Sequence, residues 1–210
     1  MKRVDELIER YPLLNSCKDD IICAFETLKK CFESGQKLLI AGNGGSCSDA
    51  EHIAGELMKG FKGKRAIDDE FSNALKAVDA SRGKELAEKL QKGLPTIVLS
   101  NHQSLNTAFA NDVENGGLFT FAQQVNVYGE QGDVLLAIST SGNAENVLNA
   151  CVVAKAKKMT VVGLTGKDGG YLKKMANVSI VVPNNETYVI QEYHLPIYHC
   201  LCLMLEESLF

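Results

Sequence analysis

Five short apolar runs, separated by stretches with helical periodicity, constrain the fold of this chain more than any other feature. Each run is rich in Val, Ile and Leu, and the runs cover residues 37–41, 96–99, 134–138, 160–164 and 178–182. Uninterrupted apolar runs of this length are typical of strands covered on both faces, as in a parallel sheet. Helical patterns lie between them, at residues 144–157, 47–61 and 105–112. This alternation predicts an α/β domain with a parallel sheet flanked by helices.

Both ends of the chain are predicted to be helical. Residues 19–34 carry apolar side chains close to a 3.6-residue period and are followed by Gly35, a common helix stop. Residues 186–205 are mostly apolar, so this helix should be buried on nearly all sides. A chain of 210 residues suits a single domain. We therefore expect this helix to be buried at the subunit interface of a homo-oligomer. Pro196 removes one backbone hydrogen bond and is able to kink the helix.

One stretch, residues 61–94, does not fit the alternating pattern. It is polar, charged and helix-favouring, most clearly over residues 73–91. The sequence leaves open whether it is a helical insertion over the site or a mobile flap. We treat residues 1–210 as one domain that contains this insertion.

Composition excludes several classes of function. The net charge is −4 and no basic tract is present, which argues against direct nucleic-acid binding. No apolar run is long enough to cross a membrane, and the start of the sequence lacks a signal-peptide core. The seven cysteines are odd in number and irregular in spacing, so we expect small buried thiols in a reducing cytoplasm. Cys47 is the exception to watch, because it follows a glycine-rich loop.

Two of the predicted strands end in loops of small residues. The first loop contains Asn43, Gly44, Gly45 and Ser46, and the second contains Ser139, Thr140, Ser141 and Asn143. Backbone N–H groups and hydroxyls at a helix N-terminus suit a phosphate group, and ligands of open α/β sheets bind where the strands end. Neither loop matches the usual nucleotide-binding motifs. Ordinary capped turns are the alternative for each loop taken alone.

Two histidine-containing clusters are candidates for the chemistry. His52 and Glu56 have i,i+4 spacing on the helix that follows the first loop, which puts both side chains on one face. An isolated pair with this spacing is more often a surface hydrogen bond, but its position near a candidate phosphate loop favours a site.

The second cluster lies in the apolar C-terminal helix and comprises Gln191, Glu192, His194 and His199. Polar groups in such a helix need partners when they are buried. At about 100° per residue, Glu192 and His199 are nearly in line, whereas Gln191 and His199 are about 80° apart. His194 and His199 diverge by about 140°, so they are not expected to bind one metal ion.

The order and spacing of these motifs resemble those of the phosphoheptose isomerases, a family of the SIS (sugar isomerase) domain superfamily. The matching segments are Ala41-Gly42-Asn43-Gly44-Gly45-Ser46, Asp49-Ala50-x-His52-x-x-x-Glu56, Ser139-Thr140-Ser141-Gly142-Asn143, and Gln191-Glu192-x-His194 with His199. The resemblance implies a five-stranded parallel sheet in a flavodoxin-like three-layer sandwich. It also implies a homotetramer with N- and C-terminal helices at the interfaces and active sites between subunits. The implied reaction converts sedoheptulose 7-phosphate into D-glycero-D-manno-heptose 7-phosphate.

The resemblance also assigns roles to individual residues. It implies one zinc ion bound by His52, Glu56, Gln191 and His199, whereas helical spacing alone slightly prefers Glu192 to Gln191. In an isomerisation through an enediolate, Glu56 is the expected base and His199 the expected acid. The zinc ion would polarise the carbonyl group. The two small-residue loops and Gln191 would bind the substrate.

The sequence departs from the family pattern at two positions. His102 stands where we align an Asp of the family, and Ala144 stands where the family usually has another Ser on the phosphate loop. Two alternative functions remain at this stage. One is a non-catalytic SIS protein, either a sugar-phosphate-binding regulator or a tetramer associated with a replication initiator. The other is an isomerase of a different ketose phosphate. The set of His52, Glu56, Gln191 and His199 favours an enzyme, because the non-catalytic relatives do not need it.

Overall fold

The structure, a computed structural model, describes residues 2–210 and contains one five-stranded sheet. All neighbouring strands are parallel, and their order is β2-β1-β3-β4-β5. This is the flavodoxin-like order, so the predicted fold class is confirmed. The strands are β1 (Leu38–Gly42), β2 (Thr96–Val98), β3 (Val134–Ser139), β4 (Thr160–Thr165) and β5 (Val178–Val181).

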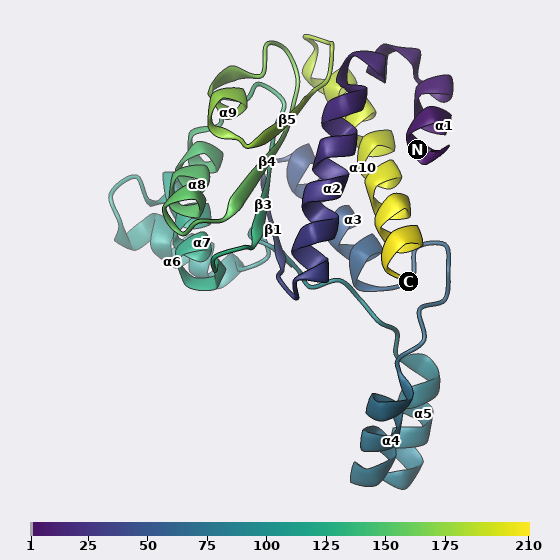
Figure 1. The fold of residues 1–210 in the computed structure, drawn as a ribbon. Helices are drawn as coiled ribbons and strands as arrows, with labels where there is room; N and C mark the ends of the chain where they lie inside the picture. Colours follow the sequence, from purple (N-terminus) through teal and green to yellow (C-terminus); the bar gives the residue numbers. More distant parts are fainter. Residues whose placement is uncertain (1) are drawn as a thin grey trace.

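Helices cover both faces of the sheet and make three layers (Figure 1). Alternate strand residues point to opposite faces, so Leu38 and Ile40 of β1 join one apolar core while Leu39 and Ala41 join the other. The first face is covered by α1 (Lys2–Arg10), α2 (Lys18–Glu33), α3 (Gly45–Met58) and α10 (Thr187–Leu209). The second face is covered by α7 (Thr120–Tyr128), α8 (Glu145–Ala156) and α9 (Gly170–Met175). On this side also lie α6 (Gln103–Asp112) and the 3₁₀ turn η2 (Gly116–Leu118). The 3₁₀ turn η1 (Pro12–Cys17) lies on the first side, between α1 and α2.

The C-terminal helix α10 is one continuous helix, and Pro196 lies inside it without ending it. Its apolar side chains pack against α1, α2 and α3 of the same chain. These three helices already cover much of α10, so its all-round apolar character does not by itself require a second subunit. Leu195 and Tyr188 are the large apolar side chains of α10 that remain exposed before the C-terminal residue.

The insertion within residues 61–94 is a helical hairpin made of α4 (Asp69–Val78) and α5 (Ala80–Lys89). Asp68 and Asp79 cap the two helices by accepting hydrogen bonds from backbone N–H groups. The helices pack closely on each other where Gly83 meets the backbone of Leu75, and the hairpin projects from the body (Figure 1). It connects the end of α3 to the start of β2, so it leaves from the amino ends of the strands. It therefore does not cover the small-residue loops of its own chain.

The cysteines follow the expected pattern, with seven free thiols of which five are buried. Cys47 is half-buried and Cys23 is exposed. Within residues 2–210, no helix combines the length and apolarity that a membrane span requires.

Candidate active site

The two small-residue loops meet beyond the carboxyl ends of the neighbouring strands β1 and β3, where the strand order reverses. Both loops line one pocket of about 300 Å³. Such a switch point is the usual ligand site of an open α/β sheet. The lining residues are Asn43, Gly44, Gly45, Ser46, Ile138, Ser139, Thr140, Ser141, Ala144, Thr187 and Gln191. The two loops that were expected to bind a phosphate therefore line a single pocket in one chain.

A reciprocal amide pair holds the two loops together. Asn43 Nδ2 donates to Asn146 Oδ1 over 2.8 Å, and Asn146 Nδ2 donates to Asn43 Oδ1 over 2.9 Å. Gly44 has a φ of +55°, a conformation that glycine adopts without a steric penalty. This turn lets α3 begin at Gly45, with the N-terminal N–H groups of the helix at the pocket.

Asn143, an expected substrate-binding residue, lies outside the pocket lining. Its Oδ1 accepts a hydrogen bond from the backbone N–H of Tyr171, and its Nδ2 donates to the carbonyl of Ser141. Asn143 thus shapes the second loop and ties it to α9.

Gln191 lines the same pocket. A methyl group placed on Gly45 would come within 2.5 Å of Gln191 Nε2, so the Gln191 amide lies directly over the start of α3. Glu192, which helical spacing preferred as the partner of His199, is exposed. Gln191, and not Glu192, reaches the start of α3 because of how α3 packs against α10. Residue spacing along α10 alone carries no information about that packing.

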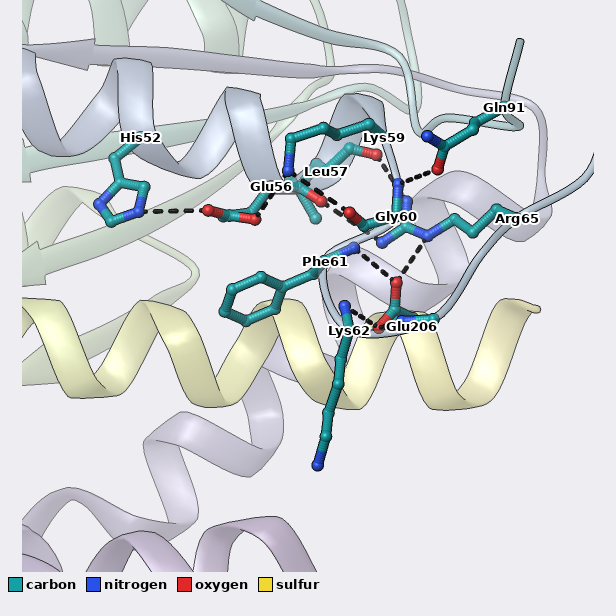
Figure 2. A network of polar contacts seen from close by, with 11 residues as sticks. His52, Glu56, Leu57, Lys59, Gly60, Phe61, Lys62, Arg65, Gln91 and Glu206 are labelled. Carbon is teal, nitrogen blue, oxygen red and sulfur yellow. Dashed lines mark hydrogen bonds and ion pairs between the residues drawn. The ribbon is translucent and has the colours of Figure 1, made fainter. Parts of the chain in front are cut away.

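A second group of polar side chains lies further along the same pair of helices. His52 Nε2 is 3.3 Å from Glu56 Oε1 (Figure 2), and the rings of His52 and His199 have centroids 5.0 Å apart. Gly45, His52 and Glu56 share one face of α3, because their spacings of seven and four residues return to the same side of a helix. We call His52, Glu56 and His199 the acid–base cluster. The pocket and this cluster thus lie at the two ends of one strip of surface along α3.

The environment of His199 suits a reactive group. Burial lowers the pKa of His199, and the neighbouring His52 lowers it further, while Glu56 opposes the shift. Its Nε2 atom is buried and has no hydrogen-bond partner among the described residues. A buried nitrogen without a partner is costly unless a ligand, water or ion engages it.

Two residues to which the sequence assigned no role, Asp49 and Tyr198, complete the cluster. The hydroxyl of Tyr198 is 3.0 Å from His52 Nδ1 and donates to Asp49 Oδ1 over 3.3 Å. Burial raises the pKa of Tyr198, so its hydroxyl stays protonated. Burial also raises the pKa of Asp49, against the opposing effects of Tyr198 and His52. The i,i+3 spacing of Asp49 and His52 on α3 was the available signal in the sequence.

His194 is a structural residue. It is fully buried, and its Nε2 is 3.4 Å from the carbonyl oxygen of Thr165. Burial lowers its pKa to about 4, so the ring is neutral at physiological pH. Its separation from the cluster around His199 agrees with the angular divergence calculated from the sequence.

A network of hydrogen bonds anchors the far end of α3 to α10 (Figure 2). Glu206 accepts hydrogen bonds from the backbone N–H groups of Phe61, Lys62 and Gly63 and from Arg65 Nε. Arg65 also donates to the carbonyl oxygens of Leu57 and Glu56 at the end of α3. We call this network the Glu206–Arg65 clasp. It fixes the helix turn that carries Glu56.

The zinc site that the resemblance implies finds suitable donors in part of the expected residue set. His52, Glu56 and His199 supply nitrogen and oxygen donors of the type zinc binds, and His199 Nε2 lacks a partner. Gln191 lies eight residues before His199, about 12 Å along the helix axis, and belongs to the pocket instead. Within residues 2–210, no three His, Cys, Asp or Glu side chains already form a metal-binding group. The donor types therefore fit zinc at three of the four expected residues, although they are not drawn together in coordination geometry.

The two departures from the family pattern have different surroundings. His102 Nε2 is 2.7 Å from the hydroxyl of Tyr128, and the two rings stack in an exposed position at the start of α6. Ala144 lines the pocket and contributes no hydroxyl, while its backbone N–H donates to Ser139 Oγ over 3.4 Å.

Comparisons with known proteins agree with this geometry. The model of the SIS domain family matches residues 72–166. The chain is 38% identical over 185 residues to the phosphoheptose isomerase of Trichlorobacter lovleyi, a match that covers 88% of this chain and 80% of the relative. It resembles the solved phosphoheptose isomerases of Neisseria gonorrhoeae and Francisella tularensis, with TM-scores of 0.74 and 0.76 and sequence identities of 30% and 31%. Each structural match covers 97% of this chain and 94% of the other.

Proposed function

This chain belongs to the phosphoheptose isomerase family, and we propose on that premise that it interconverts sedoheptulose 7-phosphate and D-glycero-D-manno-heptose 7-phosphate. One observation carries the proposal. A phosphate-type pocket and an acid–base cluster lie on the same face of α3, at Gly45 and at His52 and Glu56.

The separation of these two parts suits a long sugar phosphate. Gly45 and His52 are seven residues apart, about 10 Å along the helix. A phosphate held at the loops would leave the far end of an extended open-chain sugar near the cluster. In a heptulose 7-phosphate that end carries the carbonyl group, so the reacting carbons and the phosphate occupy opposite ends of the strip.

The chemistry requires a base and an acid beside the carbonyl group. We assign Glu56 as the base that removes a proton from C1 of the ketose and returns it to C2. His199 donates a proton to the oxygen on C2 and accepts the proton of the hydroxyl on C1, so an enediolate forms and collapses to the aldose. Gln191 and the loop residues bind the phosphate end and orient the sugar.

We also propose that zinc is held by His52, Glu56 and His199, with a fourth position open to substrate, as in other catalytic zinc sites. When bound, the ion would polarise the carbonyl oxygen. The donor types and the unpartnered His199 Nε2 support this assignment. The expected fourth ligand, Gln191, is assigned to substrate binding.

The assembly and location of the protein belong to the same proposal. We infer a homotetramer in the cytoplasm, with the terminal helices at its interfaces. The exposed apolar side chains Leu13, Tyr188 and Leu195 lie in η1 and α10 and support an interface that involves the terminal helices. The seven free thiols support a reducing compartment. Light scattering of the purified protein should give four times the mass of one 22.8 kDa chain.

Isomerisation in deuterated water tests the catalytic proposal. Purified protein with added zinc should convert sedoheptulose 7-phosphate into an aldose that carries solvent deuterium at C2, measured by NMR. Glu56→Gln should lower turnover by about 10² to 10⁴-fold, because it removes the base. Glu51→Gln changes an exposed carboxylate of the same helix and should leave turnover unchanged.

The alternatives predict other outcomes of this experiment. Exchange with a different ketose phosphate, but not with the heptulose, would replace the proposed substrate. Binding without exchange or turnover would favour a non-catalytic SIS protein. Full activity of Glu56→Gln would show that another group is the base.

A further inference from the structure

We propose that Tyr198 and Asp49 act as positioning residues that fix the tautomer of His52, with the proton on Nδ1 and a free lone pair on Nε2. The proposal deepens the proposed function and rests on it in one respect, the role of His52 as a metal ligand. The tautomer itself is a property of the protein without metal or substrate.

The direction of the hydrogen bonds follows from counting protons. Tyr198 has one O–H proton and two neighbours, Asp49 Oδ1 at 3.3 Å and His52 Nδ1 at 3.0 Å. An ionised carboxylate accepts hydrogen bonds and donates none. Asp49 Oδ2 is buried and has no partner among residues 2–210. If Tyr198 gave its proton to His52, Asp49 would lose the side-chain donor that the structure provides for it, and a buried carboxylate without a donor is strongly disfavoured.

Tyr198 therefore donates to Asp49, and its oxygen is left to accept a hydrogen bond from His52. The neutral imidazole ring has one proton, so placing it on Nδ1 leaves Nε2 as an acceptor. Nε2 is the atom that faces Glu56, 3.3 Å from Oε1, on the side of the ring toward the acid–base cluster. Two acceptors that face each other at this distance suit a cation between them. The chain Asp49–Tyr198–His52 thus prepares His52 to bind a metal through Nε2.

Such a chain has a general chemical role. A histidine that binds a metal through one nitrogen usually donates its other N–H to an oxygen, and that hydrogen bond fixes the ring orientation. Here the oxygen comes from the phenol of a buried tyrosine on α10, while Asp49 and His52 share α3. The contact therefore also links the orientation of His52 to the packing of the two helices.

Nitrogen NMR on metal-free protein tests the tautomer directly. At about pH 8, the His52 ring should show a protonated Nδ1 and an unprotonated Nε2. The signals would be assigned by their loss in His52→Asn. Tyr198→Phe keeps the buried ring and removes only the hydroxyl, and it should shift the proton to Nε2, where Glu56 can accept it. Tyr193→Phe makes the same change elsewhere on α10 and should leave the His52 signals unchanged.

Zinc affinity gives a second readout. Chelator competition should show zinc binding about 10- to 100-fold weaker in Tyr198→Phe than in the parent protein, and unchanged in Tyr193→Phe. Asp49→Ala should weaken binding similarly, and the double variant should be no weaker than the weaker single variant, because both residues act through one hydrogen-bond chain.

Several results would overturn the proposal. A parent protein with the proton on Nε2 would reverse the assignment, and this measurement does not depend on whether any variant folds. An unchanged tautomer and unchanged zinc affinity in Tyr198→Phe would leave the hydroxyl without a positioning role. If the tautomer is as expected but sedoheptulose 7-phosphate is not turned over, only the proposed substrate fails.

Discussion

At the scale of single residues, Gly45 offers the sharpest test of the pocket. A methyl group at this position would overlap the end of the flexible Gln191 side chain. The three atoms nearest to it all belong to that side chain, and none is a backbone atom. We predict that Gly45→Ala folds normally but displaces the Gln191 amide. The KM for the sugar phosphate should rise about tenfold, the equivalent of one hydrogen bond to a charged group, with little change in kcat.

The matched control lies on the same helix. Gly55 has no atom within 4 Å of an added methyl group. Gly55→Ala should keep the parent KM and increase the free energy of unfolding by up to about 1 kcal/mol, because alanine favours the helix. Steady-state kinetics and urea unfolding measure both effects. An unchanged KM in Gly45→Ala would remove Gln191 from substrate binding.

The sequence predicted some site residues better than others. The i,i+4 spacing of His52 and Glu56 was enough to place them on one face. Gln191 came from the family resemblance, because spacing along α10 preferred Glu192. Tyr198 and Asp49 received no role from the sequence, since their contact arises only when α3 and α10 pack side by side in one register.

At the scale of elements, the hairpin of α4 and α5 is separable from the body. No residue of α4 is buried, and Gly83 is the buried residue of α5. The two ends of the hairpin are held together by the bridge between Ala66 and Gln91. We predict that replacing residues 68–90 with a short Asn-Gly-type turn leaves the body folded, because the bridge already brings the new ends side by side.

Circular dichroism and thermal unfolding would test this prediction. The deletion should lower helix content by the share of two ten-residue helices and shift the Tm by only a few degrees. Replacing residues 61–90 removes the Glu206–Arg65 clasp as well and should destabilise the protein by several kcal/mol, because Glu206 would be left buried without its donors. Failure of the shorter deletion to fold would show that the hairpin supports the body.

The success of the strand predictions and the failures among the helices have physical causes. Strands buried on both faces produce continuous apolar runs, so each of the five was found with its ends within about one residue, well inside the usual uncertainty of boundaries. Helix α7 (Thr120–Tyr128) was missed because its Thr, Phe, Val and Tyr residues have low helix propensity and depend on packing. The sequence could not predict that the hairpin projects from the body. The apolar residues of the two helices pack against each other, so their pattern does not indicate which other elements lie nearby.

At the scale of the whole molecule, α10 joins the stability of the fold to its chemistry. The same helix fills the core with its apolar side chains and carries Gln191, His194, Tyr198 and His199. Because His194 is fully buried and neutral, it links the stability of the entire chain to pH.

The sign and size of this link follow from the pKa of His194. The folded pKa is about 4, whereas an unfolded histidine has a pKa near 6.5. Between these values the unfolded chain binds more protons, so stability falls as the pH decreases from about 6.5 toward 4. The contribution of the neutral ring is complete above about pH 6.5, and its loss can reach about 3 kcal/mol at the acid end of this range. Burial also lowers the pKa of His199, which adds a change of the same sign.

Urea unfolding at several pH values separates the two histidines. The parent protein should lose stability between about pH 7 and pH 5, and His194→Gln should show a shallower loss because one titrating group is gone. His102→Gln makes the same substitution at an exposed position and is the matched control. Proton NMR should also show the His194 ring still neutral at about pH 5.5, a pH at which an ordinary histidine is mostly protonated. Equal slopes in the parent protein and His194→Gln, or early protonation of the His194 ring, would mean that this histidine reaches solvent and that α10 opens more readily than its packing implies.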